Sequence, residues 1–301
     1  MGISIYKIKK WVKMLTGNSI SHVNQGVGRL FSRDEVRGYY NDLTEKVTKR
    51  EAFEGNVPVS FVDTGEKIYF PIEIFQYGLA AYDLFLETKD PVMLEKVISC
   101  ADWAVENQKE NGAWVTFAYQ NEDEPYSSMA QGEAISLLIR AYKETSKNSY
   151  LSTIENAMSF LCTSLQNGGV LDDSNGRIVF RECTFLPLVL NGWIFSIWGI
   201  WDYCLYFKNG RYEELLKRTL NSLEELLPEF DTGYWSLYTI DGRICSPFYH
   251  KLHIAQLRVM GSLTSNPLFI SYADKWEGYQ NNKLYSLVAF IKKVIQKLME
   301  R

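Results

Sequence analysis

Side chains that could bind and transform an acidic group gather in one stretch of this 301-residue chain, Gly233 to Met260. The candidates are Tyr234, Tyr238, Arg243, Tyr249, His250, Lys251, His253, Gln256 and Arg258. The chain as a whole has a net charge of −4, so an anionic ligand would need a local basic patch. The cationic side chains of this stretch, with few acids near them in sequence, could form such a patch. A solvated helix face is the competing explanation for the same pattern.

A helix is expected to present part of this stretch. Ser246 followed by Pro247 is typical of a helix N-cap and first turn. From there Tyr249, His253 and Gln256 follow the spacing i, i+4 and i+7, which places them on one helical face. The sequence therefore predicts a stripe of tyrosine, histidine and glutamine on an otherwise apolar helix.

A second group with chemical potential is Arg181-Glu182-Cys183, just before an apolar run. Glu182 could be a general base or only the salt-bridge partner of Arg181, and the sequence does not separate the two roles. Cys183 has no obvious His–Asp partnership, so a structural role is favoured over a nucleophilic one. The sequence contains no phosphate-binding loop, dinucleotide fingerprint, HExxH or GxSxG, which disfavours nucleotide-dependent enzymes and serine hydrolases.

The elements that must position these residues repeat along the chain. A polar amide beside a glycine, followed by an apolar helical pattern, occurs at Gln76-Tyr77-Gly78, Gln131-Gly132 and Asn191-Gly192, with a related start at His253 to Gln256. These starts are roughly 55–62 residues apart, a period typical of paired-helix arrays. Between the units, aromatic or β-branched stretches predict short strands at Trp114 to Tyr119, Ile178 to Phe180 and Trp235 to Ile240.

Each repeat predicts two helices joined by a short loop, and such pairs usually stack into an α/α toroid. The expected fold is all-α, an incomplete α/α barrel with short β-hairpins at one rim. Residues 1–57 are expected to be a helical or irregular segment packed on the barrel, and residues 58–301 to form the barrel. Gln76, Gln131 and Asn191 would then lie at inner-helix N-termini, where free N–H groups and the helix dipole favour anions. Capping or bridging is the alternative role for these amides.

Composition narrows the class of protein. Aromatic residues make up 14% of the chain, and aromatic faces stack on sugar rings as well as building cores. The mildly acidic charge argues against nucleic acid as a partner. Five scattered cysteines without a CxxC, and only three histidines, argue against a disulfide framework or a metal site and fit a reducing compartment.

The N-terminal residues 1–17 are not a secretory signal, because four lysines interrupt their apolar positions. The spacing is that of a basic amphipathic helix, so weak peripheral contact of residues 1–17 with an anionic membrane is one hypothesis, although an ordinary surface helix is favoured. No apolar run reaches the roughly 18 residues of a membrane span. These features predict a cytoplasmic protein.

Several segments together resemble the C-terminal catalytic domain of the D-glucuronyl C5-epimerases. Tyr69 to Leu79, YFPIEIFQYGL, is similar to the family's YPIQIAQYGL, and Ser128 to Tyr142, SMAQGEAISLLIRAY, is similar to its AMAQGQAISTLVRAY. Val189 to Gly192 with Gly199 to Asp202 resembles VLNG…GLYD, and Asp231 to Gly233, Tyr238 and Tyr249 to Leu257 resemble DTG…Y…YHTTHINQL. The matches occur in order over roughly residues 65–275. The chain resembles the bacterial type, because it lacks the β-barrel that animal members insert near QYGL.

The resemblance implies an α/α-barrel isomerase that needs no metal or other cofactor. It would convert D-glucuronate to L-iduronate residues in an acidic, heparosan-like polysaccharide by removing the C5 proton and returning one to the opposite face. By resemblance, Glu182, Tyr238 and Tyr249 match catalytic residues of the family. A positive patch would have to lower the pKa of these tyrosines towards neutral.

Further residues are assigned to the substrate. Arg243 is expected to grip the substrate carboxylate. The residues expected to bind or orient sugars are Asn191, Gln131, Gln76, His253, Gln256 and Tyr234. Members of the family are often dimeric, so a homodimer is a further expectation, although no feature of the sequence specifies an interface.

One departure from the family bears on activity. Where the family has EEYP, with a functional tyrosine, this chain has Arg181-Glu182-Cys183-Thr184. Cys183 therefore stands at the expected tyrosine, and its thiol could replace the phenol as a catalytic acid or base. Two alternatives stay open: a polysaccharide lyase on the same scaffold, which begins with the same proton abstraction and then expels the C4 substituent, and a catalytically inactive sugar-binding homologue.

Overall fold

Four helices of equal length form the inner layer of the computed structural model, which describes residues 22–50, 52–62 and 64–299. They are α3 (Pro71–Thr88), α5 (Ser128–Thr145), α7 (Leu190–Phe207) and α9 (Pro247–Thr264), each of 18 residues. Each is followed by a residue with a left-handed backbone, namely Lys89, Ser146, Lys208 and Ser265, with φ between 50° and 57°. Equal length and equal caps are the structural form of the repeat seen in the sequence.

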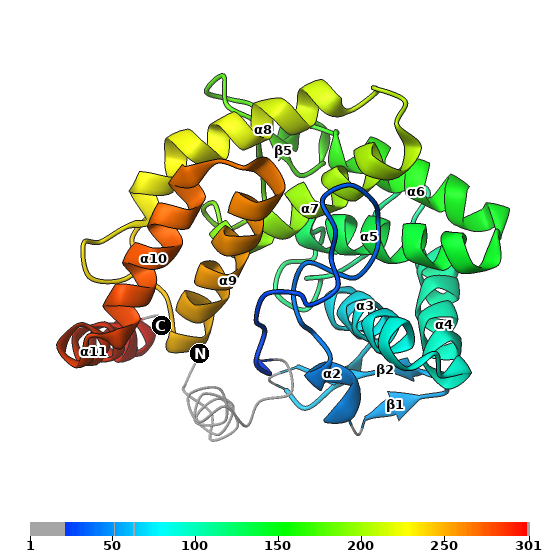
Figure 1. Ribbon diagram of the computed structural model, residues 1–301, viewed down its shortest axis with the longest axis horizontal. Coiled ribbons are helices and arrows are strands. Elements are labelled where there is room, and N and C mark those ends of the chain that lie inside the picture. Colours follow the sequence, from blue (N-terminus) through cyan, green and yellow to red (C-terminus); the bar gives the residue numbers. More distant parts are fainter. Residues whose placement is uncertain (1–21, 51, 63, 300–301) are drawn as a thin grey trace.

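An outer helix follows each inner helix and packs against it. The outer helices are α4 (Pro91–Asn107), α6 (Asn148–Leu161), α8 (Glu213–Leu226) and α10 (Pro267–Asn281). Asp90 and Asn266 cap two of them, accepting the N–H of Val92 and Leu268 at 2.9 and 3.0 Å. The pairs follow one another in an open arc from α3 to α9 (Figure 1). The predicted incomplete α/α toroid is therefore confirmed.

Helices α5 and α7 approach each other closely at two glycines. A Cβ on Gly132 would lie 2.5 Å from the carbonyl oxygen of Phe195, and one on Gly199 would lie 2.4 Å from Cα of Gly132. Real Cβ atoms do not make contacts of this length, so the helices can only cross here with hydrogen at both positions. The contact fixes the relative position of the two helices whose first turns border the pocket described below.

The described N-terminal part of the chain crosses the barrel instead of extending it (Figure 1). We call residues 28–43 the strap. Its Tyr39 N–H donates to Asp83 of α3 at 2.8 Å, and its Tyr40 hydroxyl donates to Asp202 of α7 at 2.7 Å. Arg140 of α5 pairs with Asp202 at 2.6 Å and also donates to two strap carbonyls. These three helical residues are each thirteenth in their helix, so the strap covers the C-terminal end of the inner layer.

Short antiparallel hairpins lie before α3, α7 and α9, at the opposite rim from the strap. They are β1 (Phe53–Glu54) with β2 (Val57–Pro58), β3 (Ser60–Phe61) with β4 (Lys67–Ile68), β5 (Leu171–Asp172) with β6 (Val179–Phe180), and β7 (Leu237–Thr239) with β8 (Arg243–Ile244). The strand expected at Trp114 to Tyr119 was wrong. That segment is a loop in which the N–H groups of Thr116 and Phe117 both donate to the carbonyl of Pro125. Proline has no backbone N–H, so Pro125 cannot return a hydrogen bond as a strand partner would.

The remaining elements are a short helix α2 (Glu45–Thr48), the 3₁₀ turns η1 (Leu165–Asn167) and η2 (Leu227–Phe230), and a final helix α11 (Lys283–Met299). All five cysteines are free thiols. Within the described residues, no helix combines the length and the apolar character needed to cross a membrane. The hypothesis about residues 1–17 concerns a segment that lies outside the described residues.

Candidate active site

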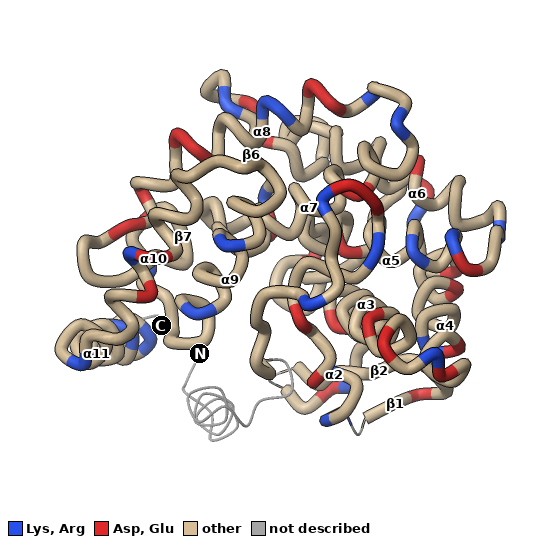
Figure 2. The backbone as a smooth tube through the Cα atoms, viewed as in Figure 1, with Lys and Arg blue, Asp and Glu red and all other residues tan. Residues whose placement is uncertain are grey.

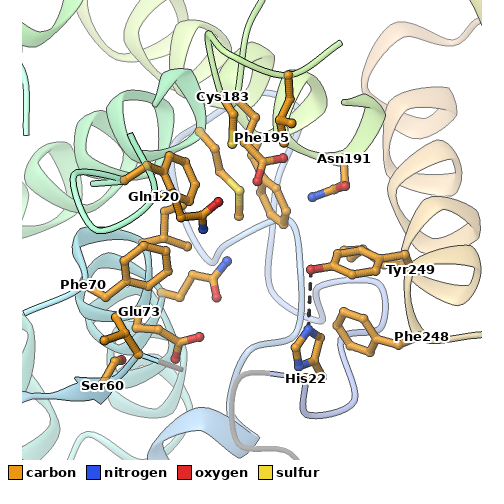
Figure 3. Close-up of a pocket in the computed structure, with 18 of the residues that line it drawn as sticks. His22, Ser60, Phe70, Glu73, Gln120, Cys183, Asn191, Phe195, Phe248 and Tyr249 are labelled. Carbon is orange, nitrogen blue, oxygen red and sulfur yellow. Dashed lines mark hydrogen bonds between the residues drawn. The ribbon is translucent and has the colours of Figure 1, made fainter. Parts of the chain in front are cut away.

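A pocket of about 300 Å³ lies at the N-terminal end of the inner helices, a volume within the usual range for small-ligand sites. Six of the residues expected from the sequence line it: Gln76, Glu182, Cys183, Asn191, Tyr238 and Tyr249. Glu73 and Ser60 lie on one side of the pocket, and Tyr249 and His22 on the other (Figure 3). The pocket therefore lies between residues from the first and the last repeats of the arc.

Glu182 reaches the pocket from the loop between β6 and α7. The N–H of Ser128, the first residue of α5, donates to the carbonyl of Arg181 at 3.2 Å and holds this loop in place. The side chain of Arg181 pairs with Asp172 at 3.6 Å, so it is not the ion-pair partner of Glu182. The Glu182 residue is 7% exposed, and its Oε2 has no hydrogen-bond partner among the described residues. Burial raises the pKa of Glu182 to about 7, which suits a group that must both take and release protons near neutrality.

Tyr238 and Tyr249 form an aromatic pair beside this carboxyl group. Tyr238 comes from β7 and Tyr249 from the first turn of α9, and their ring centroids are 4.8 Å apart. The predicted N-cap is confirmed, because Ser246 Oγ accepts the Tyr249 N–H at 3.4 Å. The expectation that a positive patch lowers the tyrosine pKa values was wrong. Burial, with the Glu182 charge as the next cause, raises the pKa of both tyrosines, so they stay protonated at neutral pH.

His253 does not reach the pocket. Its Nδ1 lies 3.2 Å from Ser236 Oγ and 3.5 Å from Cys245 Sγ, inside a buried cluster that also includes His250. Ser236 Oγ is 2.8 Å from His250 Nδ1, and the His250 ring stacks on Trp235 with centroids 3.7 Å apart. Burial lowers the pKa of His250 to about 4 and that of His253 to about 3, so both are neutral. The cluster joins the β7–β8 hairpin to α9, and so holds Tyr238 against Tyr249.

Arg243 and Tyr234 also lie outside the pocket. The Arg243 side chain is 39% exposed on β8 and lies 3.8 Å from Asp241. Tyr234 packs beside Tyr285, with centroids 6.3 Å apart, and under the ammonium group of Lys292 at 4.9 Å. None of the described residues that line the pocket is lysine or arginine. The structure therefore gives no support to Arg243 as the grip on a substrate carboxylate, because the hairpin turns this side chain towards solvent.

The repeated amides have separate surroundings. Gln131 donates to the carbonyls of Gly112 and Ala157 at 3.0 and 3.3 Å, which makes it a bridge between helix and loop instead of a sugar ligand. Gln256 donates to the Asn191 carbonyl at 3.1 Å and supports the first turn of α7 from outside the pocket. Asn191 lines the pocket, and its buried Oδ1 has no hydrogen-bond partner among the described residues. Asn191 is thus available to a ligand.

Gln76 connects the pocket to a buried acid. It lines the pocket and donates to Oε1 of Glu133 at 2.7 Å. Burial raises the pKa of Glu133 well above its usual range, which favours the neutral form of this carboxyl group. Gln76 is the sixth residue of α3, because the helix begins at Pro71 instead of at the amide.

Two further lining residues were not expected from the sequence. Glu73 of α3 is buried and forms ion pairs with Lys46 at 3.0 Å and Arg50 at 2.7 Å. Burial opposes its ionisation, but these two cations outweigh burial and lower its pKa. His22 Nε2 lies 3.5 Å from the Tyr249 hydroxyl (Figure 3). Glu73 carried a usable signal, since it precedes Gln76 by three residues and so shares its helical face, whereas His22 lies far from the repeats in sequence.

Cys183 lines the pocket as a neutral thiol. Burial, followed by the charge of neighbouring Glu182, raises its pKa well above the usual range. A thiolate base at this position is therefore disfavoured. Among the residues that the structure describes, no three His, Cys, Asp or Glu side chains converge as a metal ion would require.

Comparison with known proteins assigns a family. Residues 108–278 match the family described as D-glucuronyl C5-epimerase C-terminus. A D-glucuronyl C5-epimerase of Caenorhabditis elegans is 28% identical over 214 residues, which cover 62% of this chain and 35% of that protein. An uncharacterized protein of Methanocaldococcus jannaschii is 27% identical over 198 residues, covering 61% of this chain and 64% of its own.

The fold also has a solved relative. The structure of cellobiose 2-epimerase from Spirochaeta thermophila matches with a TM-score of 0.51 at 12% identity, over 76% of this chain and 64% of that chain. At this identity the likeness concerns the fold alone. The matched region of this chain spans only about a third of the Caenorhabditis protein and about two thirds of the archaeal one.

Proposed function

We propose that this chain, which belongs to the D-glucuronyl C5-epimerase family by its match to that family's C-terminal region, inverts C5 of D-glucuronate residues in an acidic, heparosan-like polysaccharide. The observation that carries the proposal is the state of Glu182, whose buried carboxyl group has a pKa near 7 and lines the pocket beside Tyr238 and Tyr249. A pKa near the operating pH suits a group that takes a proton in one step and releases it in another.

In the proposed reaction, the Glu182 carboxylate takes the proton from C5 of the uronate. The electron pair of that C–H bond moves into the adjacent carboxylate and forms an enediolate. A neutral tyrosine, Tyr249, then delivers its phenolic proton to the opposite face of C5. Exchange of both groups with solvent restores the Glu182 carboxylate and the Tyr249 phenol. Glu182 and Tyr249 both line the pocket, so a sugar ring bound there would have both groups within its surroundings.

We propose that hydrogen-bond donors of the pocket, and not a cation, stabilise the enediolate that proton abstraction forms. Burial keeps Tyr238 and Tyr249 protonated, so each offers an O–H group. In a buried site these donors stabilise a developing oxyanion more strongly than water would. Asn191, with its unpartnered Oδ1, is proposed to orient a sugar hydroxyl.

Proton exchange at C5 tests the proposal. The chain is incubated in D₂O with heparosan and with other glucuronate polymers, and NMR follows deuterium at C5 and new iduronate signals. We expect exchange with the wild type, with a rate that rises towards a plateau as pH passes about 7. We expect at least a hundredfold loss in Glu182→Gln and in Tyr249→Phe, while Tyr272→Phe on the outer helix α10 keeps the wild-type rate.

Three outcomes would contradict the proposal. Ultraviolet absorbance from an unsaturated product would indicate a lyase. Binding of the polymer without any exchange would indicate a sugar-binding protein. Exchange that survives Glu182→Gln would place the base elsewhere.

A further inference from the structure

The C-terminal helix α11 faces its apolar side outward. Six of its apolar residues, Leu284, Leu287, Ile291, Val294, Ile295 and Leu298, are between 38% and 64% exposed. Their spacing of three and four residues places them on one side of the helix. Phe290 and Met299 extend the same exposed surface at 39% and 75%. We call these eight residues the α11 apolar face.

The opposite side of α11 is fixed to the protein by polar contacts. Gln296 accepts the N–H of Ile244 at 2.9 Å and donates to the carbonyl of Gly242 at 3.0 Å. Lys293 donates to the carbonyl of Ile244 at 2.8 Å, and Ala289 is 1% exposed against the same hairpin. A helix that only had to pack on the barrel would bury its apolar side, so the observed orientation leaves apolar surface that the other described residues do not cover.

The charges on α11 have a single sign. No aspartate or glutamate occurs between Lys283 and Met299, whereas Lys283, Lys292, Lys293 and Lys297 are all cationic. In Figure 2 the helix shows only blue and tan. At 100° per residue, Lys283 and Lys292 lie at the two edges of the α11 apolar face. A lysine at the edge of an apolar surface can lay its methylene chain along that surface and keep its ammonium group in water.

We propose that α11 docks on an anionic lipid surface, lying in the plane of the interface with the α11 apolar face among the acyl chains. The apolar side would enter the headgroup boundary, and the flanking lysines would meet lipid phosphates. A second copy of this chain is a poorer occupant, because paired α11 helices would oppose lysine to lysine without any acid to compensate. The proposal does not depend on the epimerase activity.

Vesicle sedimentation with the full chain tests this. We expect binding to phosphatidylcholine vesicles that contain phosphatidylglycerol, weaker binding to phosphatidylcholine alone, and weakening by salt. The triple variant Leu287→Ser, Ile291→Ser and Leu298→Ser should lose at least tenfold in affinity. Lys283→Glu with Lys292→Glu should lose a similar factor on anionic vesicles. As a control, Val92→Ser with Val115→Ser removes exposed apolar side chains elsewhere and should bind like the wild type.

The same samples identify the outcomes that overturn the proposal. Circular dichroism and melting temperature show whether each variant is folded, and only folded variants are compared. Equal binding to neutral and anionic vesicles, or no binding to either, contradicts the proposal. A wild-type dimer that the triple variant abolishes would show instead that a second copy covers the α11 apolar face.

Discussion

Gly192 lies against Glu182 so closely that a Cβ at this position would be 2.2 Å from Oε2 and 2.5 Å from Cβ of the glutamate. Gly192 is the third residue of α7, so it brings the backbone of that helix against the carboxyl group. The missing side chain is therefore a condition for the position of Glu182 in the pocket.

Gly192→Ala is expected to displace the Glu182 side chain and to reduce C5 exchange at least tenfold, although alanine favours helices more than glycine does. Exchange by NMR and the melting temperature measure the two effects. Gly278→Ala in α10 is the matched control, because nothing lies within 4 Å of its added Cβ. A wild-type exchange rate in Gly192→Ala would show that the carboxyl position does not matter.

Glu182 is expected to make the protein less stable at alkaline than at acidic pH. Burial raises its folded pKa from 4.5 to about 7, so between these values the unfolded state releases the proton before the folded state does. The free energy of unfolding therefore falls as pH rises through this window, by about 3 kcal/mol at most. Denaturation should show that the free energy of unfolding of Glu182→Gln, relative to that of the wild type, is higher at pH 8 than at pH 5. Parallel behaviour of the two proteins would mean that Glu182 is not buried as described.

His253 should act in the opposite sense. Its folded pKa is lowered from 6.5 to about 3, because burial and neighbouring His250 disfavour the charged ring. Its contribution to stability is complete above pH 6.5 and is lost as pH falls towards 3. His253→Gln should therefore weaken the loss of stability between pH 6.5 and 4 by about 3 kcal/mol. Melting temperatures of both proteins across this range provide the comparison, and an unchanged acid slope would refute the prediction.

The buried pair of Arg140 and Asp202 is expected to hold the strap. Arg140→Met would leave Asp202 without its ion-pair partner, and we expect a loss of about 3–5 kcal/mol in the free energy of unfolding. Arg140→Met with Asp202→Leu should be less destabilised than Arg140→Met, since no buried charge remains. Urea denaturation measures both. Exposed Arg177→Met, whose partner Glu225 is also exposed, is the control and should cost less than about 1 kcal/mol.

Cys183 is expected to be dispensable as a base. Burial keeps its thiol protonated, so Cys183→Ala should retain C5 exchange within about tenfold, with the same dependence on pH. Cys183→Ser, which replaces the thiol by a hydroxyl of similar size, is the companion variant. A loss of a hundredfold or more in both variants, with unchanged melting temperatures, would assign the thiol a direct part in proton transfer.

The helix pairs of the fold could be predicted because each helix carries strong signals in its own sequence. The proline and glycine positions, the apolar spacing and the repeat of amide and glycine identified the helix pairs, and these produced the confirmed toroid. Boundaries were less accurate where packing decides them. Helix α3 begins five residues before Gln76, and the segment at Trp114 is a loop hydrogen-bonded to Pro125 instead of the expected strand.

The direction of each side chain depended on tertiary packing. Tyr249 and His253 share a helical face in the sequence pattern, yet Tyr249 borders the pocket and His253 lies in the cluster behind it, because the β7–β8 hairpin covers part of that face. Glu73 and His22 entered the pocket from outside the stretches with obvious chemistry. The expected lowering of the tyrosine pKa values failed for a similar reason, since burial depends on neighbours that are distant in sequence.

The sequence by itself determined the helical repeat, the family and the identity of the carboxyl and phenol groups, because periodicity, capping and motif order are properties of local segments. Only the tertiary structure decided which of those groups share one pocket, which are neutral, and which face of α11 is turned to solvent. These properties depend on distance and on exclusion of water, which arise when segments far apart in the chain pack together.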